Sequence, residues 1–506
     1  MVRRYGKRSQ PEDAAKTLIR TNLLKWYDEN KRSLPWRNQI STEDVNQKAY
    51  AVWVSEIMLQ QTQVATVIDY YNRWMTKWPT LQELAKAKLE EVNEMWSGLG
   101  YYSRGKRLHE GAKKVVNELE GQVPKSAADL EKKLPGVGRY TAGAIASIAL
   151  GEKTGVVDGN VIRVFSRLRM IGADVSSPAT MDKFWELANE LADCERTGDL
   201  NQGLMELGAM VCTPKSPKCS LCPLQETCRA FAKVNLEKKQ AAGRLISRES
   251  DQCGLLDIEC LADACQWCLP SDEPWDKSLG VQNLPRKAKK KAPREQMAAV
   301  TVVCKLGKDS QQQFLLMKRP EKGLLAGLWE FPNFDVKGEA EISTNSEDIL
   351  QRLKNNHSVE VASAENVKTV GDVLHLFSHI HQTYCVTLVS VTEQNIKVTS
   401  QRPWQWLTNA EVNEAAIPTA MKKVFSACMK VLEGRNDVQG KKRKRNETGQ
   451  SDAKQRSIDS FFKLNFLSRL AVVCCLASAV GGKSMQAALP AFTLPFEAHE
   501  VCAACR

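Results

Sequence analysis

The sequence predicts a mainly α domain followed by an α+β domain. Its 506 residues are too many for one core, because a domain commonly holds about 100 to 200 residues. Between about residues 18 and 235, apolar residues recur at spacings of three and four, which is typical of helices. From Ala298 onward, short apolar runs indicate strands with a helix among them. A single small module is therefore excluded.

The composition narrows the class of protein. Lys and Arg outnumber Asp and Glu by 71 to 59, and this formal charge of +12 favours a polyanionic partner without proving one. We expect no signal peptide, and eight of the 16 cysteines lie between Cys212 and Cys268, so metal binding explains them better than disulfides do. The longest apolar run, residues 470–482, is shorter than the roughly 20 residues that cross a bilayer. We therefore expect no membrane span.

The elements can be placed coarsely along the chain. Helices are expected at 52–74, 89–96, 140–150 and 346–353, and strands at 300–304, 314–317 and 383–391. The periodicity fades from about residue 238, where cysteines, prolines and finally a basic run indicate a connector. The expected organisation is a basic N-terminal arm at 1–17, a helical domain at 18–237, the connector at 238–296, an α+β domain at 297–432, a disordered basic tail at 433–462 and an unassigned tail at 463–506.

A glycine-rich turn precedes the expected helix at 140–150. Gly136 and Gly138 allow the backbone to bend so that N–H groups and a helix N-terminus point at an anion such as a DNA phosphate. An ordinary helix-turn-helix corner explains the same five residues equally well. Asp158 follows twenty residues later and by default would be a helix N-cap.

Taken together, these segments resemble the helix-hairpin-helix DNA glycosylases, in which such a hairpin is followed by a catalytic Asp. The match is specific at residues 53–64 (WVSEIMLQQTQV), 98–104 (GLGYYSR) and 134–144 (LPGVGRYTAGA), where the chain is similar to MutY-type adenine DNA glycosylases. The resemblance covers residues 20 to about 430. It implies a mainly α helix-hairpin-helix glycosylase domain with an iron–sulfur loop, a Nudix-like second domain, and removal of adenine mispaired with 8-oxoguanine or guanine.

Two acids have the chemistry that this reaction needs. Cleaving a purine N-glycosidic bond requires a proton on the base and an anion beside the sugar as positive charge develops there. Glu56 lies among apolar residues, so burial would raise its pKa and retain a proton for donation. Without the resemblance, a hydrogen-bonded buried acid is the lesser alternative for Glu56. Asp158 is the candidate anion.

One position near the start of the helix that follows the hairpin distinguishes two subclasses of these glycosylases. In the related endonuclease III type, a lysine at this place attacks the sugar and allows strand cleavage. This chain has Tyr140, which has no amine, so the resemblance implies a monofunctional enzyme. Tyr140 and Asn160 are then expected to position Asp158 and the sugar, although Tyr140 could simply pack against its helix.

A base inside a duplex must be extruded before it can react, so wedge and pocket residues are expected. The resemblance assigns Gln61 and Tyr101 as wedges in the base stack. The residues assigned to the flipped adenine are Arg32, Trp36, Arg37 and Gln202. For Trp36, a place in the core is a competing interpretation.

The cysteines form two groups. Cys212, Cys219, Cys222 and Cys228 fall within seventeen residues and can surround one compact cluster, whereas structural zinc sites usually show two tight pairs farther apart. Their spacing is that of the [4Fe–4S] loop of this family. The second group, Cys260, Cys265 and Cys268 with Cys253 as a candidate fourth ligand, resembles the zinc site of animal members, but its spacing differs, so reduced thiols in a flexible connector are the alternative.

The second domain begins with a run that resembles a Nudix-type fold at residues 324–332. Hydrolysis is not expected, because only Glu347 and Asp348 stand where such an enzyme needs paired glutamates on a helix for magnesium. The resemblance instead implies reading of 8-oxoguanine by Phe377, Ser378 and His379, although a bare strand-edge turn would have the same sequence.

The tail contains two short motifs. Gln455, Ile458, Phe461 and Phe462 place apolar anchors on one side of a helical turn and resemble the motif that binds the replication sliding clamp. Residues 441–445 have the composition of a nuclear import signal, so a nuclear protein is expected, and a mitochondrial isoform stays open. Other repair factors could bind the connector.

Two other classes of function compete with the glycosylase. A catalytically inactive mismatch-binding scaffold would not need Glu56 and Asp158. A hydrolase of free nucleotides would need the glutamate set that the second domain lacks.

Overall fold

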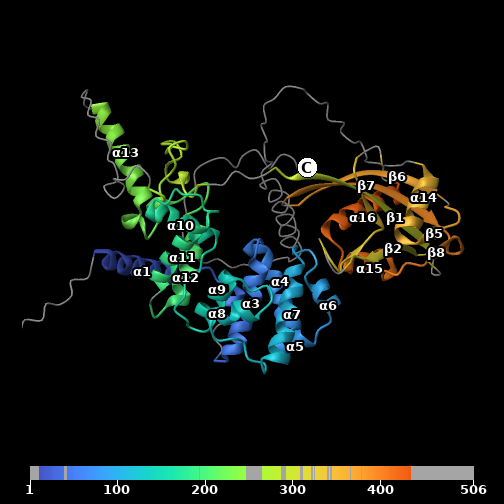
Figure 1. Cartoon of the computed structure of the whole chain (residues 1–506), viewed down its shortest axis with the longest axis horizontal. Helices are drawn as coiled ribbons and strands as arrows, with labels where there is room; N and C mark the ends of the chain where they lie inside the picture. The colour runs from blue at the N-terminus through green and yellow to red at the C-terminus, as the bar shows by residue number, and fades with distance from the viewer. Residues whose placement is uncertain are drawn as a thin grey trace, which may run out of the picture. The chain divides into compact units, whose positions relative to one another are not determined.

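The computed structural model of the chain describes residues 11–434 apart from 39–42, 193, 247–264, 287–291, 308–310, 321, 322, 324, 339, 340, 342–344, 365 and 378 (Figure 1). The predictions for Cys253, Cys260, Ser378, the clamp motif (Gln455, Ile458, Phe461 and Phe462) and both tails lie outside these residues, as do the first ten residues of the N-terminal arm. None of the helices in the described part has the length and apolarity that a membrane crossing requires.

The first part of the described chain is helical, as its periodicity predicts. The helices are α1 (Pro11–Asn30), α2 (Pro35–Asn38), α3 (Val45–Leu59), α4 (Val64–Lys77), α5 (Leu81–Lys86), α6 (Leu89–Met95), α7 (Ser103–Glu118), α8 (Ala127–Lys133), α9 (Arg139–Ala149), α10 (Gly159–Arg169), α11 (Pro178–Ala192), α12 (Thr197–Met210) and α13 (Arg229–Ile246). One expected helix, 52–74, was wrong as a single element, because a turn at Gln60–Gln63 divides it into α3 and α4. In addition, α13 continues past the residue at which the periodicity fades.

Two apolar cores hold these helices together. In the first, the indoles of Trp74 and Trp96 meet edge to face at 5.5 Å, and Trp53 is fully buried beside them. The second joins α1 to α10, α11 and α12 through residues such as Leu23, Phe165 and Phe184. The helices of the two cores meet where α9 packs against α12, and the main pocket is lined from both sides of this boundary.

The second part of the described chain forms a mixed sheet. Its strands are β1 (Arg294–Leu306), β2 (Gln312–Lys318), β3 (Trp329–Glu330), β4 (Asn333–Val336), β6 (Asn366–Leu376), β7 (Ile380–Val391) and β9 (Trp404–Thr408), while β5 (Val359–Val361) and β8 (Ile396–Val398) pair separately. Its helices are α14 (Ser346–His357), α15 (Asn409–Glu414) and α16 (Thr419–Leu432). The strand order is β3-β2-β1-β7-β6, and β1 runs parallel to β7, with Val300 opposite Val386.

Alternation along β1 explains why helices cover both faces of this sheet. Val300 and Val302 point into a core with Phe425 of α16, whereas Val303 points to the other face, toward Leu353 of α14. A strand buried on both faces reads as a continuous apolar run, which is the pattern seen at residues 300–304. The predicted α+β character of this part is therefore observed.

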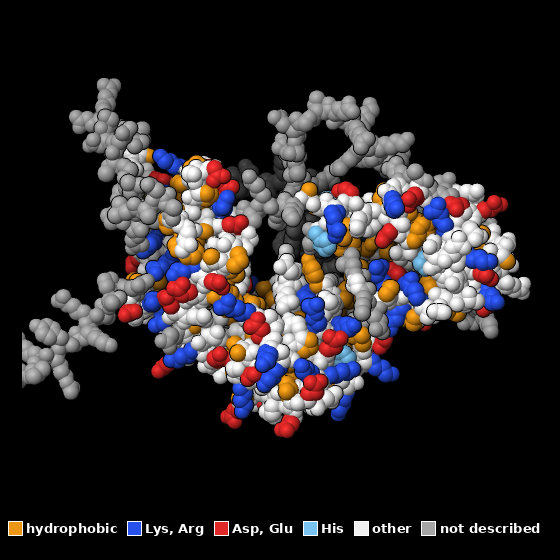
Figure 2. All heavy atoms as spheres, viewed as in Figure 1, with side chains coloured by type: hydrophobic (Ala, Val, Ile, Leu, Met, Phe, Trp, Pro, Cys, Tyr) orange, Lys and Arg blue, Asp and Glu red, His pale blue; other side chains and the backbone are white. Residues whose placement is uncertain are grey.

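Surface charge is mixed. On the face shown in Figure 2, Lys and Arg side chains are interspersed with Asp and Glu rather than gathered in one patch. Net charge alone therefore does not mark a binding surface there, and the site must be found from its chemistry.

Candidate active site

Glu56 is a buried acid in an otherwise apolar stretch of α3. Glu56 is only 6% exposed, and the hydroxyl of Tyr140 donates a hydrogen bond of 2.7 Å to its Oε2. Burial raises the pKa of Glu56 to about 7, although the bond from Tyr140 opposes this shift. A substantial fraction of Glu56 therefore carries a proton near neutral pH, as an acid catalyst requires.

The hairpin before α9 positions Tyr140. Gly136 has φ +78°, and a Cβ there would lie 2.9 Å from Cβ of Arg107, so only glycine fits without strain. Gly138 is the N-cap of α9 and no side chain caps the helix, while the space beside its Cα is open. The first amides of α9 are thus presented as the predicted phosphate contact would need.

Asp158 is the N-cap of α10 and also lines the pocket. Its Oδ1 accepts hydrogen bonds from the backbone N–H groups of Asn160 and Val161, at 2.9 and 2.8 Å, and its Oδ2 accepts one from Nδ2 of Asn160 at 2.8 Å. Burial raises the pKa of Asp158, and these bonds together with the charge of Arg163 oppose the rise. Asp158 therefore fits both interpretations: its carboxylate caps the helix, and it also lies where the predicted anion beside the sugar would be.

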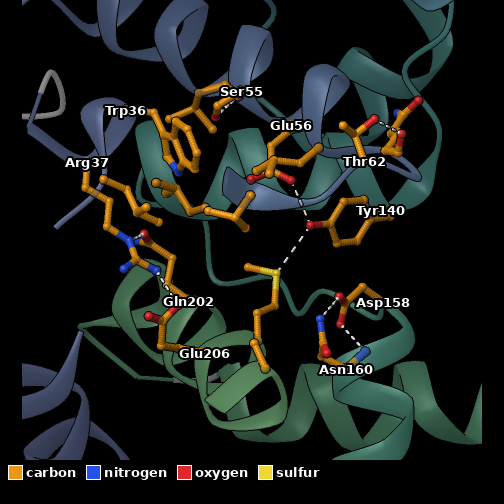
Figure 3. Close-up of a pocket in the computed structure, with 18 of the residues that line it drawn as sticks. Trp36, Arg37, Ser55, Glu56, Thr62, Tyr140, Asp158, Asn160, Gln202 and Glu206 are labelled. Atoms are coloured by element: carbon orange, nitrogen blue, oxygen red, sulfur yellow. Dashed lines mark hydrogen bonds and ion pairs between the residues drawn. The ribbon is translucent and has the colours of Figure 1, made fainter. Parts of the chain in front are cut away.

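Tyr140 has a hydrogen-bond partner that the sequence did not predict. Its hydroxyl donates to Oε2 of Glu56 and lies 3.3 Å from Sδ of Met205. Its expected role, to position Asp158 and the sugar together with Asn160, stays a prediction. Asn160 does bond Asp158 (Figure 3). Asn160 is held in turn by Arg163, which donates to its Oδ1 at 2.6 Å and to the carbonyl of Cys212 at 2.7 Å.

These side chains surround a cavity of about 470 Å³, large enough for a nucleobase. Among the predicted site residues, those that line it are Arg32, Trp36, Arg37, Glu56, Gln61, Tyr140, Asp158, Asn160 and Gln202. Figure 3 shows Glu56 and Tyr140 on one side of the site, Asp158 and Asn160 on another, and Arg37 with Gln202 and Glu206 on a third. Trp36 fits both interpretations, as a core residue and as a pocket residue. It is buried with its ring edge-on to Tyr71 at 5.4 Å, and it also lines the cavity.

The two predicted wedge residues share an unusual backbone. Gln61 has φ +56° and Tyr101 has φ +48°, a left-handed conformation that costs L-residues about 1 to 2 kcal/mol. The buried guanidinium of Arg104 donates to the carbonyls of Met58 and Gly100 at 3.1 and 3.0 Å, and also to that of Gln60. One cation thus ties together the turn that carries Gln61 and the loop that carries Tyr101, whose side chain is 49% exposed.

The four cysteines of the first group line one small apolar cavity. Cys212, Cys219, Cys222 and Cys228 surround it together with Val211, Phe231 and Val281. Nη1 of Arg167 donates to Sγ of Cys212 at 3.3 Å, as a thiolate ligand would favour. Burial raises the pKa of the Cys222 thiol to about 12, so ionised sulfur here needs the compensating charge of iron. The residues therefore fit an iron–sulfur cluster, which would hold the loop after α12 together.

The zinc prediction is not resolved by the described residues. Cys265 and Cys268 are described, but two of the four candidates are not. Among the residues described, no three His, Cys, Asp or Glu side chains lie close enough to hold a single metal ion.

The predicted recognition loop lies between β6 and β7. Phe377 packs partly against the sheet core, with its ring 4.5 Å from that of His375, while His379 is exposed at the turn. Both lie in the turn between these strands, and neither lines the pocket of the helical part. Tyr101, Gly136 and Gly138 also lie outside that pocket lining.

Sequence reasoning did not single out Glu206 or Arg163. Glu206 lies one helical turn after Gln202 on α12 and contacts both predicted arginines, while Arg163 lies one turn after Asn160 on α10. The only signal in the sequence was this spacing of three or four residues from a predicted site residue.

A buried proton donor, a facing carboxylate and a hairpin open to phosphate define a DNA N-glycosylase of the helix-hairpin-helix class. Family profiles agree: residues 54–190 match the HhH-GPD superfamily of base excision DNA repair proteins, 212–228 the iron-sulfur binding domain of endonuclease III, and 303–427 the NUDIX domain. The predicted fold class, enzyme class and iron–sulfur cluster are thereby confirmed.

Among known proteins, the chain is 50% identical to human adenine DNA glycosylase over 88% of this chain and 81% of that protein. It is 49% identical to the rat adenine DNA glycosylase over 88% of this chain and 85% of the relative. The chain belongs to the adenine DNA glycosylase family, which removes adenine from DNA in base excision repair. A solved complex between the C-terminal domain of mouse MUTYH and human PCNA is 32% identical over 28% of this chain and 91% of that one, with a TM-score of 0.24.

Proposed function

We propose that the chain removes adenine mispaired with 8-oxoguanine or guanine and leaves an abasic site without cutting the strand. The observation that carries the chemistry is the buried pair of Glu56 and Tyr140, which shares one base-sized cavity with Asp158. Glu56 donates its proton to the flipped adenine, so that the bond between the base and C1′ can break with the electrons leaving on a neutral base. Asp158 stabilises the positive charge that develops on the sugar until water adds to C1′.

The monofunctional mode rests on the absence of an amine. A Schiff base with the sugar needs a neutral lysine, and no lysine is among the described residues that line the cavity. Tyr140 stands where the lyase subclass has a lysine, and its hydroxyl donates a hydrogen bond to Glu56. Borohydride should therefore trap no covalent protein–DNA adduct, and strands should break only after alkali. Efficient trapping would place the chain in the lyase subclass.

The preference for 8-oxoguanine is assigned to the Nudix-like domain, at residues 297–432. Phe377 and His379 flank Ser378 at the β6–β7 turn, where an aromatic ring and polar side chains can probe a base edge. Nucleotide hydrolysis is not proposed, because Asp348 of α14 is paired with Arg352 at 3.0 Å rather than with a second carboxylate.

The remaining assignments follow the same organisation. The helix-hairpin-helix glycosylase domain spans 18–237 and carries a [4Fe–4S] cluster on Cys212, Cys219, Cys222 and Cys228. The connector at 238–296 holds zinc through Cys260, Cys265 and Cys268, with Cys253 as the candidate fourth ligand. The motif of Gln455, Ile458, Phe461 and Phe462 binds the sliding clamp, and residues 441–445 direct the chain to the nucleus.

One experiment separates this function from its competitors. A duplex containing adenine opposite 8-oxoguanine is incubated with excess protein, and one half of each sample is treated with alkali. Alkali-dependent cleavage at the adenine is expected. Binding without cleavage would indicate a mismatch-binding scaffold, and hydrolysis of free nucleotides without action on the duplex would indicate a Nudix hydrolase.

A further inference from the structure

Glu206 occupies a wall of the adenine pocket that no assigned role explains. It lies on α12, is only 3% exposed, and lines the same cavity as Glu56. A carboxylate buried to this degree normally requires compensating charge. Here the compensation comes from a segment about 170 residues earlier in the chain, which contributes two arginines.

The carboxylate of Glu206 accepts four hydrogen bonds. Its Oε1 accepts from the backbone N–H of Arg32 at 3.1 Å and from Nε of Arg32 at 2.6 Å. Its Oε2 accepts from Nη2 of Arg32 at 3.0 Å and from Nη2 of Arg37 at 3.1 Å. Burial alone would raise the pKa of Glu206, but the bonds from Arg32 and Arg37 hold it below the usual carboxyl range. Glu206 is therefore a fixed anion.

Arg37 is fixed on its other edges as well. Its Nε donates to Oε1 of Gln202 at 3.1 Å, and its Nη1 donates to the carbonyl of Arg32 at 2.8 Å. Each guanidinium has five N–H donors and no acceptor. Both arginines line the cavity, so N–H groups that the protein does not engage are available to acceptor atoms of a ligand, such as the ring nitrogens of a purine.

We propose that Glu206 is a positioning residue for adenine excision, which holds Arg32 and Arg37 together at one wall of the pocket and screens their charge from the acid Glu56. This proposal rests on the proposed function. It assigns Glu206 no contact with the reacting bond, so its effect must pass through the arginines and through the protonation of Glu56.

The charges around Glu56 explain why screening matters. Glu56 on α3 faces Tyr140 from α9, Asp158 from the N-cap of α10, and Arg37 from α2, while Arg32 and Glu206 complete the charged and titratable lining. Asp158 raises the pKa of Glu56 and Arg37 lowers it. Arg32, Arg37 and ionised Glu206 together carry a net charge of +1. Without the charge of Glu206 the cluster carries +2, which favours ionised Glu56 and removes the proton that excision needs.

The test is a pH series of single-turnover excision with the full chain and an adenine–8-oxoguanine duplex. In Glu206→Gln the rate should fall at lower pH than in the wild type, because the pKa of Glu56 drops by about one unit. An amide also holds the arginines less firmly, so excision should be slower at every pH, but the loss should be about sevenfold greater at pH 8 than at pH 5.5. Glu206→Asp keeps the charge, so its pH profile should match the wild type, while its shorter side chain lowers the rate at every pH.

The controls separate a local role from a structural one. Glu186→Gln removes a surface carboxylate of α11 that pairs with Lys183 and should change neither rate nor profile. Unfolding transitions and the visible absorbance of the cluster establish that each variant is folded. An unshifted profile in folded Glu206→Gln overturns the screening, and a wild-type rate in Glu206→Asp overturns the positioning. If Glu206→Gln does not fold, Glu206→Asp still decides the positioning. Absence of excision by the wild type would instead refute the proposed function.

Discussion

Two buried glutamates, one in each folded part of the chain, show how partners rather than burial decide what a carboxyl group does. Glu56 in the helical part is 6% exposed and Glu330 in the sheet part is 4% exposed. Glu56 accepts one hydrogen bond from the phenol of Tyr140, a neutral group. Glu330 accepts from Arg402 at 2.8 Å and from Arg319, which are both cations. The first can therefore retain a proton, whereas the second is paired with two cations, one just after β2 and one shortly before β9.

The helical part contains both arrangements within one cavity. Glu206 is bound by Arg32 and Arg37 as Glu330 is bound by its two arginines, yet it lines the pocket that also contains Glu56. A buried acid near a cavity is thus insufficient evidence for acid catalysis. The two acids differ in their donors. Among the hydrogen bonds of the described residues, Glu206 accepts from two arginines, whereas Glu56 accepts from a neutral phenol.

The largest effect should come from Asp158→Asn, which tests whether a charge beside the sugar is needed as well as a proton donor. The amide preserves the shape and the cap oxygen but removes the negative charge, so excision should fall by about 1,000-fold while duplex binding is kept. Single-turnover excision and a binding titration measure the two quantities. Asp174→Asn is a matched control, because Asp174 accepts from the backbone N–H of Ser176 at 2.8 Å on the surface. Turnover within tenfold of wild type would remove Asp158 from the mechanism.

Glu56→Gln should lower excision by about 100-fold or more, because the amide cannot donate an acidic proton. In the wild type the rate should decline as pH rises through about 7, since the raised pKa of Glu56 leaves it protonated below that value and ionised above it. The decline should vanish in the variant, whose residual rate no longer depends on this group. A pH series of both proteins decides the matter, and wild-type speed in Glu56→Gln would mean that another acid acts.

From the sequence, the two candidate acids could be proposed, but not all of the side chains that surround them. Glu56 and Asp158 could be proposed because their chemistry and their local motifs agree, and each lies on or beside a helix that periodicity reveals. Glu206 could not, because its partners Arg32 and Arg37 are 174 and 169 residues away, and no local pattern reports such a pair. The hydrogen bond from Tyr140 to Glu56 spans 84 residues and was likewise missed.

The same limit applies to the fold. The apolar runs of β1, β2 and β7 were visible, but the parallel pairing of β1 with β7 joins Arg294 to Ile380 and leaves no local trace. The edge strand β6 has mostly exposed or half-buried residues, so it carries no apolar run. α13 continues to Ile246 because Glu, Lys, Gln and Ala favour helix even where apolar periodicity fades.

Stability should respond in opposite directions at the two glutamates. The folded-state pKa of Glu56 is raised, so its contribution to stability is greatest at low pH and is lost as pH rises through about 7; Glu56→Gln should therefore melt higher than wild type at pH 8 and about equally at pH 5. Glu330→Gln should lose about 2 kcal/mol, because it leaves two partly buried guanidinium groups without their anion.

Calorimetry of each variant at the two pH values measures these changes. Glu393→Gln removes a surface carboxylate that pairs with Lys305 and should stay within about 0.5 kcal/mol of wild type. If Glu56→Gln instead lowers the melting temperature at pH 8, then the ionised carboxylate of Glu56 stabilises the fold as that of Glu330 does, and the contrast is wrong.

Arg104→Lys should slow excision by about tenfold, since lysine keeps the charge but cannot span both loops as a guanidinium does. Without this link, the left-handed backbone of Gln61 and Tyr101 loses its support, and the extrusion of the base should suffer more than the binding of the duplex. A fluorescent adenine analogue reports extrusion directly. Arg73 is an exposed residue of α4 whose guanidinium stacks on Tyr70 at 4.6 Å, so Arg73→Lys should behave as wild type. Unimpaired extrusion in Arg104→Lys would leave Arg104 a structural role only.

The smallest expected effect concerns the sheet part, where we expect recognition rather than chemistry. His379→Ala removes an exposed side chain at the β6–β7 turn, and the loss of one hydrogen bond of about 1 kcal/mol should reduce the preference for 8-oxoguanine over guanine by about fivefold. His381, two residues later on β7, pairs with Glu295 of the neighbouring strand β1 at 2.8 Å, so His381→Ala is a matched control that should keep the preference. The ratio of single-turnover rates on the two duplexes is the measurement. The rate on the guanine duplex itself should not change in either variant, because the proton donor and the anion lie in the helical part. A fall on both duplexes alike would mean that the turn supports binding in general, and an unchanged ratio would move the reading of the damaged base to other residues of the sheet.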